Sequence, residues 1–150
     1  NRNYVIRFGA VLLVVAAVLW ASLYAPRSEM IIDKTVDIIK DAENNKVSVS
    51  DDGQSAKTIC TRLASDGKFS LVRLELLTGR THQIRAHLKH IGLSIIGDEL
   101  YGGDMSVIHR QALHCVENTV FHPRYQKLMS FTSSLPGDIT DMIDTVKARQ

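Results

Sequence analysis

The residues best suited to chemistry lie together between Thr78 and Arg85, in the order T-G-R-T-H-Q-I-R. This stretch places two guanidinium groups, an imidazole and an amide around one turn of the chain. On a helical wheel of about 100° per residue, Arg85 lies nearest an apolar stripe made by Ile84, Leu88 and Ile91, so we expect it to be half buried. Burying a guanidinium is costly unless it is paired. Arg85 therefore predicts a partner carboxylate, in a structural ion pair, or an anionic ligand.

A strand, a turn and a helix must position this stretch. Residues 69–77 are rich in large apolar and β-branched side chains and predict a strand, which Thr78-Gly79 ends. Helical spacing then begins, with Thr81 as the expected N-cap and Gly92 as the expected stop. Upstream, residues 57–64 form the other half of a hairpin around Ser65-Asp66-Gly67. Further strands are expected at residues 111–115, 119–121 and 128–132, and an amphipathic helix at residues 139–148 with Ile139, Met142, Ile143 and Val146 on its apolar side.

Several longer motifs occur in a fixed order. L-L-T-G-R-T-H-Q-I-R-A-H-L occupies residues 76–88 and is followed by Gly97-Asp98 and Tyr101-Gly102. Residues 110–114 read R-Q-A-L-H, residues 122–123 are His-Pro, and Leu135-Pro136 precede Asp138. Together with G-Q-S-A-K-T at residues 53–58, this series resembles the C-terminal part of the RluA-type RNA pseudouridine synthases, over about residues 46–142.

The resemblance implies that uridine in structured RNA, rRNA or tRNA, is isomerised to pseudouridine without a metal or organic cofactor. It implies that Arg85 is the active-site arginine, which in the family pairs with an essential aspartate. It also implies roles in the pocket or in RNA contacts for Arg80, Thr81, His82, Gln83, Lys89, Arg110 and Leu113, and roles in the motif's structure for Gly79, Gly97, Asp98, Tyr101 and Gly102.

The sequence departs from the family pattern at the essential aspartate. The family carries it in an H-R-L-D segment, and no such segment occurs in these 150 residues. Asp98 belongs to the G-D-x-x-Y-G turn, where a structural role is expected. We therefore expect the catalytic aspartate to lie in a half of the domain that precedes residue 1 or is supplied by a partner, and the isolated chain to be inactive. Tyr4 is a candidate for the family's base-stacking tyrosine, with a residue at a membrane boundary as the competing interpretation.

An apolar segment opens the chain. Residues 8–25 contain no charge, and as a helix they would span about 27 Å, close to the thickness of a bilayer core. Three interpretations stay open: a membrane anchor, a buried helix, or sequence foreign to the domain. The corresponding localisations are cytoplasmic or membrane-anchored through residues 8–25.

Composition adds modest constraints. The net charge of +2 is too small to indicate nucleic-acid binding by itself, although bases outnumber acids between Lys57 and Lys89. Cys60 and Cys115 lack paired spacing and favour buried thiols in a reducing compartment. Histidines 82, 87 and 90 invite a metal site and, as a weaker hypothesis, a metal-dependent hydrolase, but they lack the H-E-x-x-H pattern, and no metal site is assigned.

These observations predict an α+β fold with a mixed, mainly antiparallel sheet and flanking helices, preceded by an apolar helix. The expected divisions are residues 1–27 (the apolar segment), 28–56 (a helical or irregular connector and a polar hairpin region) and 57–150 (the C-terminal half of a pseudouridine synthase domain). The predicted function is RNA pseudouridine synthesis. The alternative is a catalytically inactive, RNA-binding or membrane-tethered remnant of that family.

Overall fold

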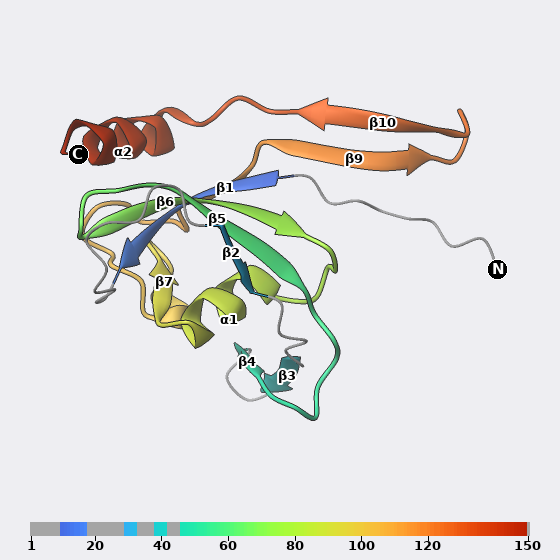
Figure 1. Ribbon diagram of the computed structural model, residues 1–150, viewed down its shortest axis with the longest axis horizontal. Helices are drawn as coiled ribbons and strands as arrows, with labels where there is room; N and C mark the ends of the chain where they lie inside the picture. The colour runs from blue at the N-terminus through green and yellow to red at the C-terminus, as the bar shows by residue number, and fades with distance from the viewer. Residues whose placement is uncertain (1–9, 18–28, 33–37, 42–45, 150) are drawn as a thin grey trace.

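The computed structural model describes residues 10–17, 29–32, 38–41 and 46–149 (Figure 1). Its centre is an antiparallel sheet with the strand order β2-β5-β6-β1-β7, in which β8 also pairs with β1. These strands are β1 (Ala10–Ala17), β2 (Glu29–Ile32), β5 (Thr58–Ser65), β6 (Phe69–Leu76), β7 (Leu93–Ile95) and β8 (Leu113–Cys115). The α+β, mainly antiparallel architecture expected from the sequence is confirmed.

The β5–β6 hairpin forms where the Asp-Gly turn predicts it. Asp66 Oδ1 accepts hydrogen bonds from the backbone N–H groups of Lys68, at 2.9 Å, and Phe69, at 2.6 Å. Gly67 adopts φ +89°, a conformation that favours glycine. The turn residues therefore fix the register of the hairpin from which the motif at residues 78–85 continues.

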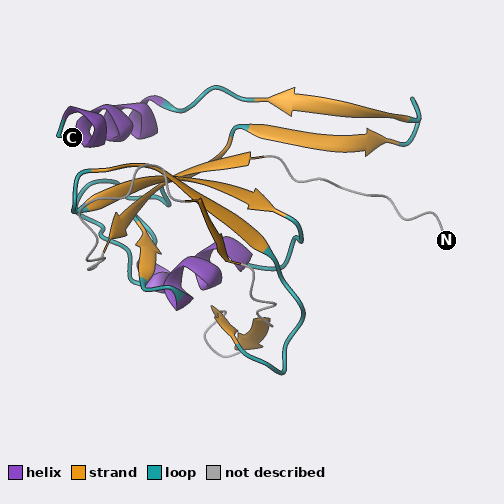
Figure 2. Ribbon diagram, in the orientation of Figure 1, coloured by secondary structure: helices purple, strands orange, loops and turns teal. Residues whose placement is uncertain are grey.

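Two helices flank the sheet (Figure 2). Helix α2 (Gly137–Ala148) packs against β1, β5 and β6, and the four apolar residues predicted for its inner face are buried. Helix α1 (Gln83–His90) packs against β7 and ends before Gly92, as expected. The expected N-cap was wrong by one residue, because His82 takes that position with φ 52° and its carbonyl accepts from Ala86 N–H.

The helix expected over residues 8–25 is wrong where the chain is described, because Ala10–Ala17 is strand β1. It runs antiparallel to β6, from Ala10 opposite Glu75 to Ala16 opposite Phe69. A continuous apolar run suits a strand inside a sheet as well as a buried helix, and periodicity does not separate the two. Residues 18–25 and Tyr4 lie outside the described residues. Within the described part of the chain, no helix is long and apolar enough to cross a membrane.

Two small hairpins lie outside the main sheet. Strands β3 (Ile38–Asp41) and β4 (Lys46–Val49) pair near α1, so the helical or irregular connector expected through residue 40 contains a strand at its end. Strands β9 (Glu117–His122) and β10 (Lys127–Thr132) form a hairpin that projects from the body in Figure 1, in the region where two strands were predicted.

Candidate active site

Arg85 makes the paired, largely buried contact that its place on α1 predicts. Its Nε donates to Asp98 Oδ2 and its Nη2 donates to Asp98 Oδ1, both at 2.7 Å. The arginine side chain is 12% exposed and the aspartate side chain 1%. The hydrogen bonds that Arg85 donates to Asp98 raise the pKa of Arg85, and the burial of Arg85 opposes this rise. The prediction of a partner carboxylate is confirmed, and the partner is a residue of the G-D-x-x-Y-G turn.

Tyr101 covers this ion pair and joins it to the β3–β4 hairpin. The Arg85 guanidinium carbon lies 4.6 Å from the centre of the Tyr101 ring, a cation–π distance. The buried Tyr101 hydroxyl accepts from Val47 N–H at 2.8 Å and donates to Val47 C=O at 3.0 Å. Tyr101 stands in the short 3₁₀ helix η1 (Glu99–Tyr101), whose first turn Asp98 caps. One carboxylate thus orients both the arginine and the tyrosine.

Gln83 is a buried support of the motif. Its Oε1 accepts from Thr78 Oγ1 at 2.8 Å and Arg80 N–H at 3.0 Å, while its Nε2 donates to Lys57 C=O and to Thr58 Oγ1. It is 3% exposed. The sequence assigned it to the pocket or to RNA contacts, whereas in the structure it ties the end of β6 to the start of β5. A polar residue in a family motif carries no signal that separates these two roles.

Of the other residues in this motif, some contact the protein and others are exposed to solvent. His82 Nδ1 lies 3.2 Å from the Tyr101 hydroxyl, and the two rings meet edge to face. Arg80 Nε donates to Ser55 C=O at 3.2 Å. Thr81 and Lys89 are exposed. Among the two motif glycines of this region, Gly79 is exposed and Gly102 has φ 76° at the end of η1.

A second arginine, Arg110, also forms an ion pair with an aspartate. Arg110 donates from Nε and Nη2 to the two carboxylate oxygens of Asp138, at 2.8 and 2.6 Å. Both side chains are a little under half exposed. The hydrogen bonds from Arg110 lower the pKa of Asp138. The backbone of Arg110 packs closely against Gly97. A Cβ at Gly97 would lie only 1.9 Å from the Arg110 carbonyl oxygen, so only glycine fits there.

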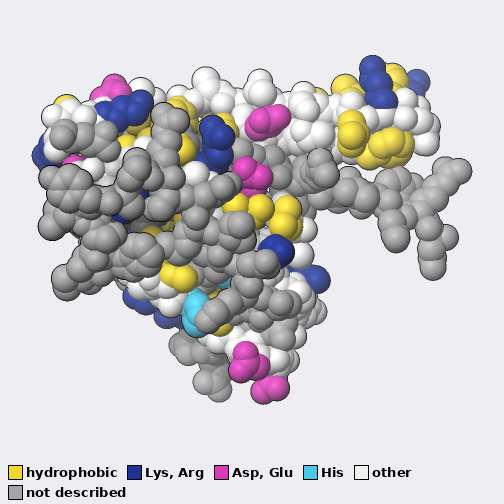
Figure 3. Space-filling model, in the orientation of Figure 1, with side chains coloured by type: hydrophobic (Ala, Val, Ile, Leu, Met, Phe, Trp, Pro, Cys, Tyr) yellow, Lys and Arg dark blue, Asp and Glu magenta, His cyan; other side chains and the backbone are white. Residues whose placement is uncertain are grey.

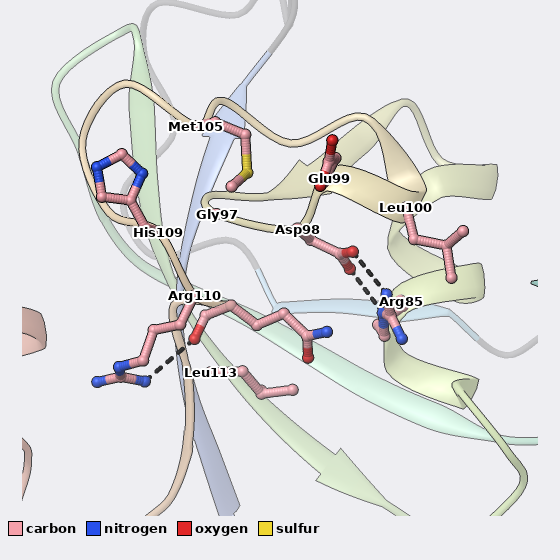
Figure 4. A pocket seen from close by; sticks show the side chains of 10 residues that line it. Arg85, Gly97, Asp98, Glu99, Leu100, Met105, His109, Arg110 and Leu113 are labelled. Carbon is pink, nitrogen blue, oxygen red and sulfur yellow. Dashed lines mark hydrogen bonds and ion pairs between the residues drawn. The ribbon is translucent and has the colours of Figure 1, made fainter.

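Arg85 and Arg110 both line one pocket, which has a volume of about 580 Å³. This volume is within the usual range for small-ligand sites. Figure 4 shows the Arg85–Asp98 pair on one side of it, with Arg110 and Leu113 nearby. Of the site residues predicted from sequence, it brings together Arg85, Arg110, Leu113, Gly97 and Asp98. Sequence reasoning missed the other lining residues, which are Glu99, Leu100, Met105, His109 and Gln111. Met105 and His109 lie between matched motifs, whereas Glu99 and Leu100 are variable positions of the G-D-x-x-Y-G turn and Gln111 is part of R-Q-A-L-H, so only their closeness to motif residues could have indicated them.

Metal-binding side chains do not gather in the described part of the molecule. Within residues 46–149, no group of three or more His, Cys, Asp or Glu side chains could hold a metal ion. His87, one of the histidines considered from sequence, is buried with its Nδ1 2.8 Å from Thr58 Oγ1. Burial, and to a lesser degree His90, lower the pKa of His87.

Comparison with known proteins decides the family. The family described as RNA pseudouridylate synthase matches residues 11–90, which run from β1 to the last turn of α1. The chain belongs to this family. The match begins inside the apolar segment, so that segment is part of the family's domain over residues 11–17 and forms the strand described above.

Curated relatives agree with this assignment. An uncharacterized RNA pseudouridine synthase of Chloroflexus aurantiacus is 40% identical over 106 residues, covering 69% of this chain and 34% of the relative. Ribosomal large subunit pseudouridine synthase D of Haemophilus influenzae is 34% identical over 110 residues, covering 64% of this chain and 34% of the relative. The RluA-type resemblance found in the sequence is confirmed. The chain spans about one third of the length of these relatives.

Solved structures show the same fold. Human RNA pseudouridylate synthase domain containing 1 superposes with a TM-score of 0.66 at 18% identity, covering 96% of this chain and 66% of that one. Human RNA pseudouridylate synthase domain containing 4 gives a TM-score of 0.62 at 19% identity, covering 95% of this chain and 62% of that one.

Proposed function

We propose that the pocket beside Arg85 holds the target uridine of an RNA pseudouridine synthase. The observation that carries this proposal is the Arg85–Asp98 pair, which fixes a cation of the family's central motif at the wall of a pocket in the size range of small-ligand sites. The large-subunit names of several relatives favour rRNA as the substrate over tRNA. A cytoplasmic location follows from that substrate.

The reaction sets what the pocket must supply. The bond between N1 of the base and C1′ of the ribose breaks, the base turns, and C5 bonds to C1′. The C5 hydrogen leaves as a proton, and N1 takes up a proton, so the product is an isomer of the substrate. An ionised carboxylate beside the sugar is needed, and a fixed cation lowers its pKa and keeps it charged. Turning the base out of a helix costs a few kcal/mol, which contacts in the pocket must offset.

Arg85 is oriented for a second acceptor. Nε and Nη2 are both used by Asp98, and Nη1 has no hydrogen bond to the described residues. We propose that Nη1 faces the aspartate of an H-R-L-D segment. No such segment occurs in the 150 residues, so the segment is supplied by another part of the protein or by a partner chain. Asp98 is then a positioning residue, because it acts on the reacting groups only through Arg85.

Release of tritium from RNA labelled at C5 of uridine tests this function. The 150-residue chain alone is expected to release none. The chain joined to, or mixed with, the H-R-L-D half of a relative is expected to release tritium, and Arg85→Ala is expected to abolish that release. Lys147→Gln removes an exposed positive charge on α2 and serves as the matched control with unchanged release. Release by the chain alone, or full activity of Arg85→Ala, would contradict the proposal.

A second candidate function is a non-catalytic RNA-binding remnant. The observation that favours it is that Asp98 already neutralises the buried arginine without any further carboxylate. In this case the chain binds RNA, but addition of an aspartate-bearing half produces no tritium release.

A further inference from the structure

The β9–β10 hairpin ends in a turn that carries an exposed aromatic ring. The turn comprises Pro123, Arg124, Tyr125 and Gln126, between the paired residues His122 and Lys127. Tyr125 is 59% exposed. Figure 3 shows hydrophobic and basic side chains gathered at this end of the hairpin, away from the body of the molecule. An exposed tyrosine on a projecting hairpin needs an explanation that the core does not supply.

The turn is held in one shape by its own hydrogen bonds. His122 Nδ1 accepts from the backbone N–H groups of Arg124, at 3.2 Å, and Tyr125, at 3.3 Å. Gln126 N–H donates to His122 C=O at 2.9 Å, and Gln126 adopts φ 51°. The His122 ring lies 4.5 Å from the Tyr125 ring at an angle of 41°. Because these contacts order the turn in advance, a ligand would pay little entropy to bind the ring.

The charge around the ring has one sign. Arg124 and Lys127 are exposed, and neither forms an ion pair with any residue that the structure describes. The Lys127 ammonium lies 6.0 Å from the centre of the Tyr125 ring. The sequence from Asn118 to Gly137 contains no acidic residue. An exposed aromatic ring in a turn that also carries two cations without ion-pair partners matches the base and phosphates of single-stranded nucleic acid.

The hairpin also sets the distance from the pocket. Strand β9 begins two residues after β8, whose Leu113 lines the pocket, and its six residues extend roughly 20 Å at about 3.3 Å each. That length corresponds to about six base-pair steps along a duplex. A nucleotide on Tyr125 is therefore not the nucleotide in the pocket.

We propose that the tip of the β9–β10 hairpin binds an unpaired nucleotide outside the target site, with its base stacked on Tyr125 and its phosphates against Arg124 and Lys127. This inference rests on the proposed function, because RNA is taken as the partner. Stacking is tolerant of sequence, so the tip selects unpaired structure at a set distance from the target uridine and reads no particular base.

Fluorescence anisotropy of the 150-residue chain with a fluorescein-labelled single-stranded oligouridylate tests the proposal, with a labelled RNA duplex as comparison. Tyr125→Ala is expected to raise Kd for the single strand about 5- to 150-fold, the range for loss of one stacked base, and to change duplex binding far less. Tyr125→Phe is expected to bind like the wild type. Arg124→Gln and Lys127→Gln are each expected to reduce the dependence of log K on log salt by about 0.7.

Two variants control for charge and for hairpin integrity. Lys147→Gln removes one exposed cation from α2, and Leu128→Ala truncates an exposed side chain on β10, so both should bind like the wild type. The proposal is overturned if Tyr125→Ala binds like the wild type, if Tyr125→Phe is as weak as Tyr125→Ala, or if the wild-type chain binds no RNA. A Tyr125 effect without tritium release in the reconstituted assay would instead leave this inference standing and overturn the proposed activity.

Discussion

Two arginines line the same pocket, each with a two-pronged hydrogen bond to one aspartate, yet the protein surrounds them differently. The Arg85–Asp98 distances are both 2.7 Å, and those of Arg110–Asp138 are 2.8 and 2.6 Å. The exposed fractions are 12% and 1% in the first pair and 44% and 43% in the second. The hydrogen-bond distances are therefore nearly the same in the two pairs, while the exposure of their side chains differs.

The comparison separates two uses of an ion pair. An exposed pair is hydrated and screened by salt, so either partner can be removed at little cost. A buried pair has lost its hydration, and removing one partner leaves the other charge without compensation. By this argument Arg85 is held rigidly at the pocket, whereas the exposed Arg110 side chain keeps the freedom to change its partner.

The largest expected effect comes from removing the buried carboxylate. Asp98→Ala leaves the Arg85 guanidinium buried and unpaired, and it also removes the cap of η1. We expect the free energy of unfolding to fall by about 3–5 kcal/mol, as measured by urea denaturation. Asp138→Ala is the matched control, because it removes an aspartate from the same kind of pair at an exposed position. Equal losses in the two variants would show that burial does not distinguish the pairs.

An intermediate effect is expected at the ring that covers the buried pair. Tyr101→Phe keeps the aromatic face against Arg85 but removes the hydroxyl bonded to both backbone polar groups of Val47. Because Val47 is 2% exposed, its N–H and C=O would lose partners away from water. The expected cost is about 1–3 kcal/mol of stability. Hydrogen exchange at the Val47 amide would rise selectively, and an unchanged exchange rate would show that the hydroxyl does not anchor β4.

The contrast between the two pairs also shows how far sequence reasoning reaches. The position of Arg85 on the helical wheel, next to apolar residues, predicted that its side chain is partly buried. Burial in turn predicted a carboxylate partner for the guanidinium. The identity of that partner was not predictable from the wheel, since Asp98 reaches Arg85 only after the chain has passed through β7 and a turn. Family resemblance supplied the importance of both residues and assigned Asp98 a structural role, without joining the two.

Local signals predicted local elements well. The Asp-Gly turn gave the β5–β6 hairpin, and the spacing of Ile139, Met142, Ile143 and Val146 gave the buried face of α2. Strand β1 was missed because an unbroken apolar run carries no period, and only its pairing with β6 distinguishes it from a helix. The internal role of Gln83 was missed for a related reason, since its partners Lys57 and Thr58 lie far back in the sequence.

The smallest expected effect is at the exposed pair, where charge can be followed directly. Arg110 holds the pKa of Asp138 below its usual range, so the pair stabilises the fold above the unfolded pKa of about 3.9 and loses that contribution as pH falls through the lower folded value. In Arg110→Gln, NMR titration of the Asp138 carboxyl should show its pKa rising toward the ordinary value. The urea midpoint at neutral pH should barely move, because water solvates the freed carboxylate.

Moderate salt should raise the pKa of Asp138 in the wild type in the same way, because it screens an exposed pair. An Asp138 pKa unchanged by the substitution would mean that the Arg110 contact does not persist in solution, and a loss of stability matching that of Asp98→Ala would mean that the exposed pair supports the fold as strongly as the buried one.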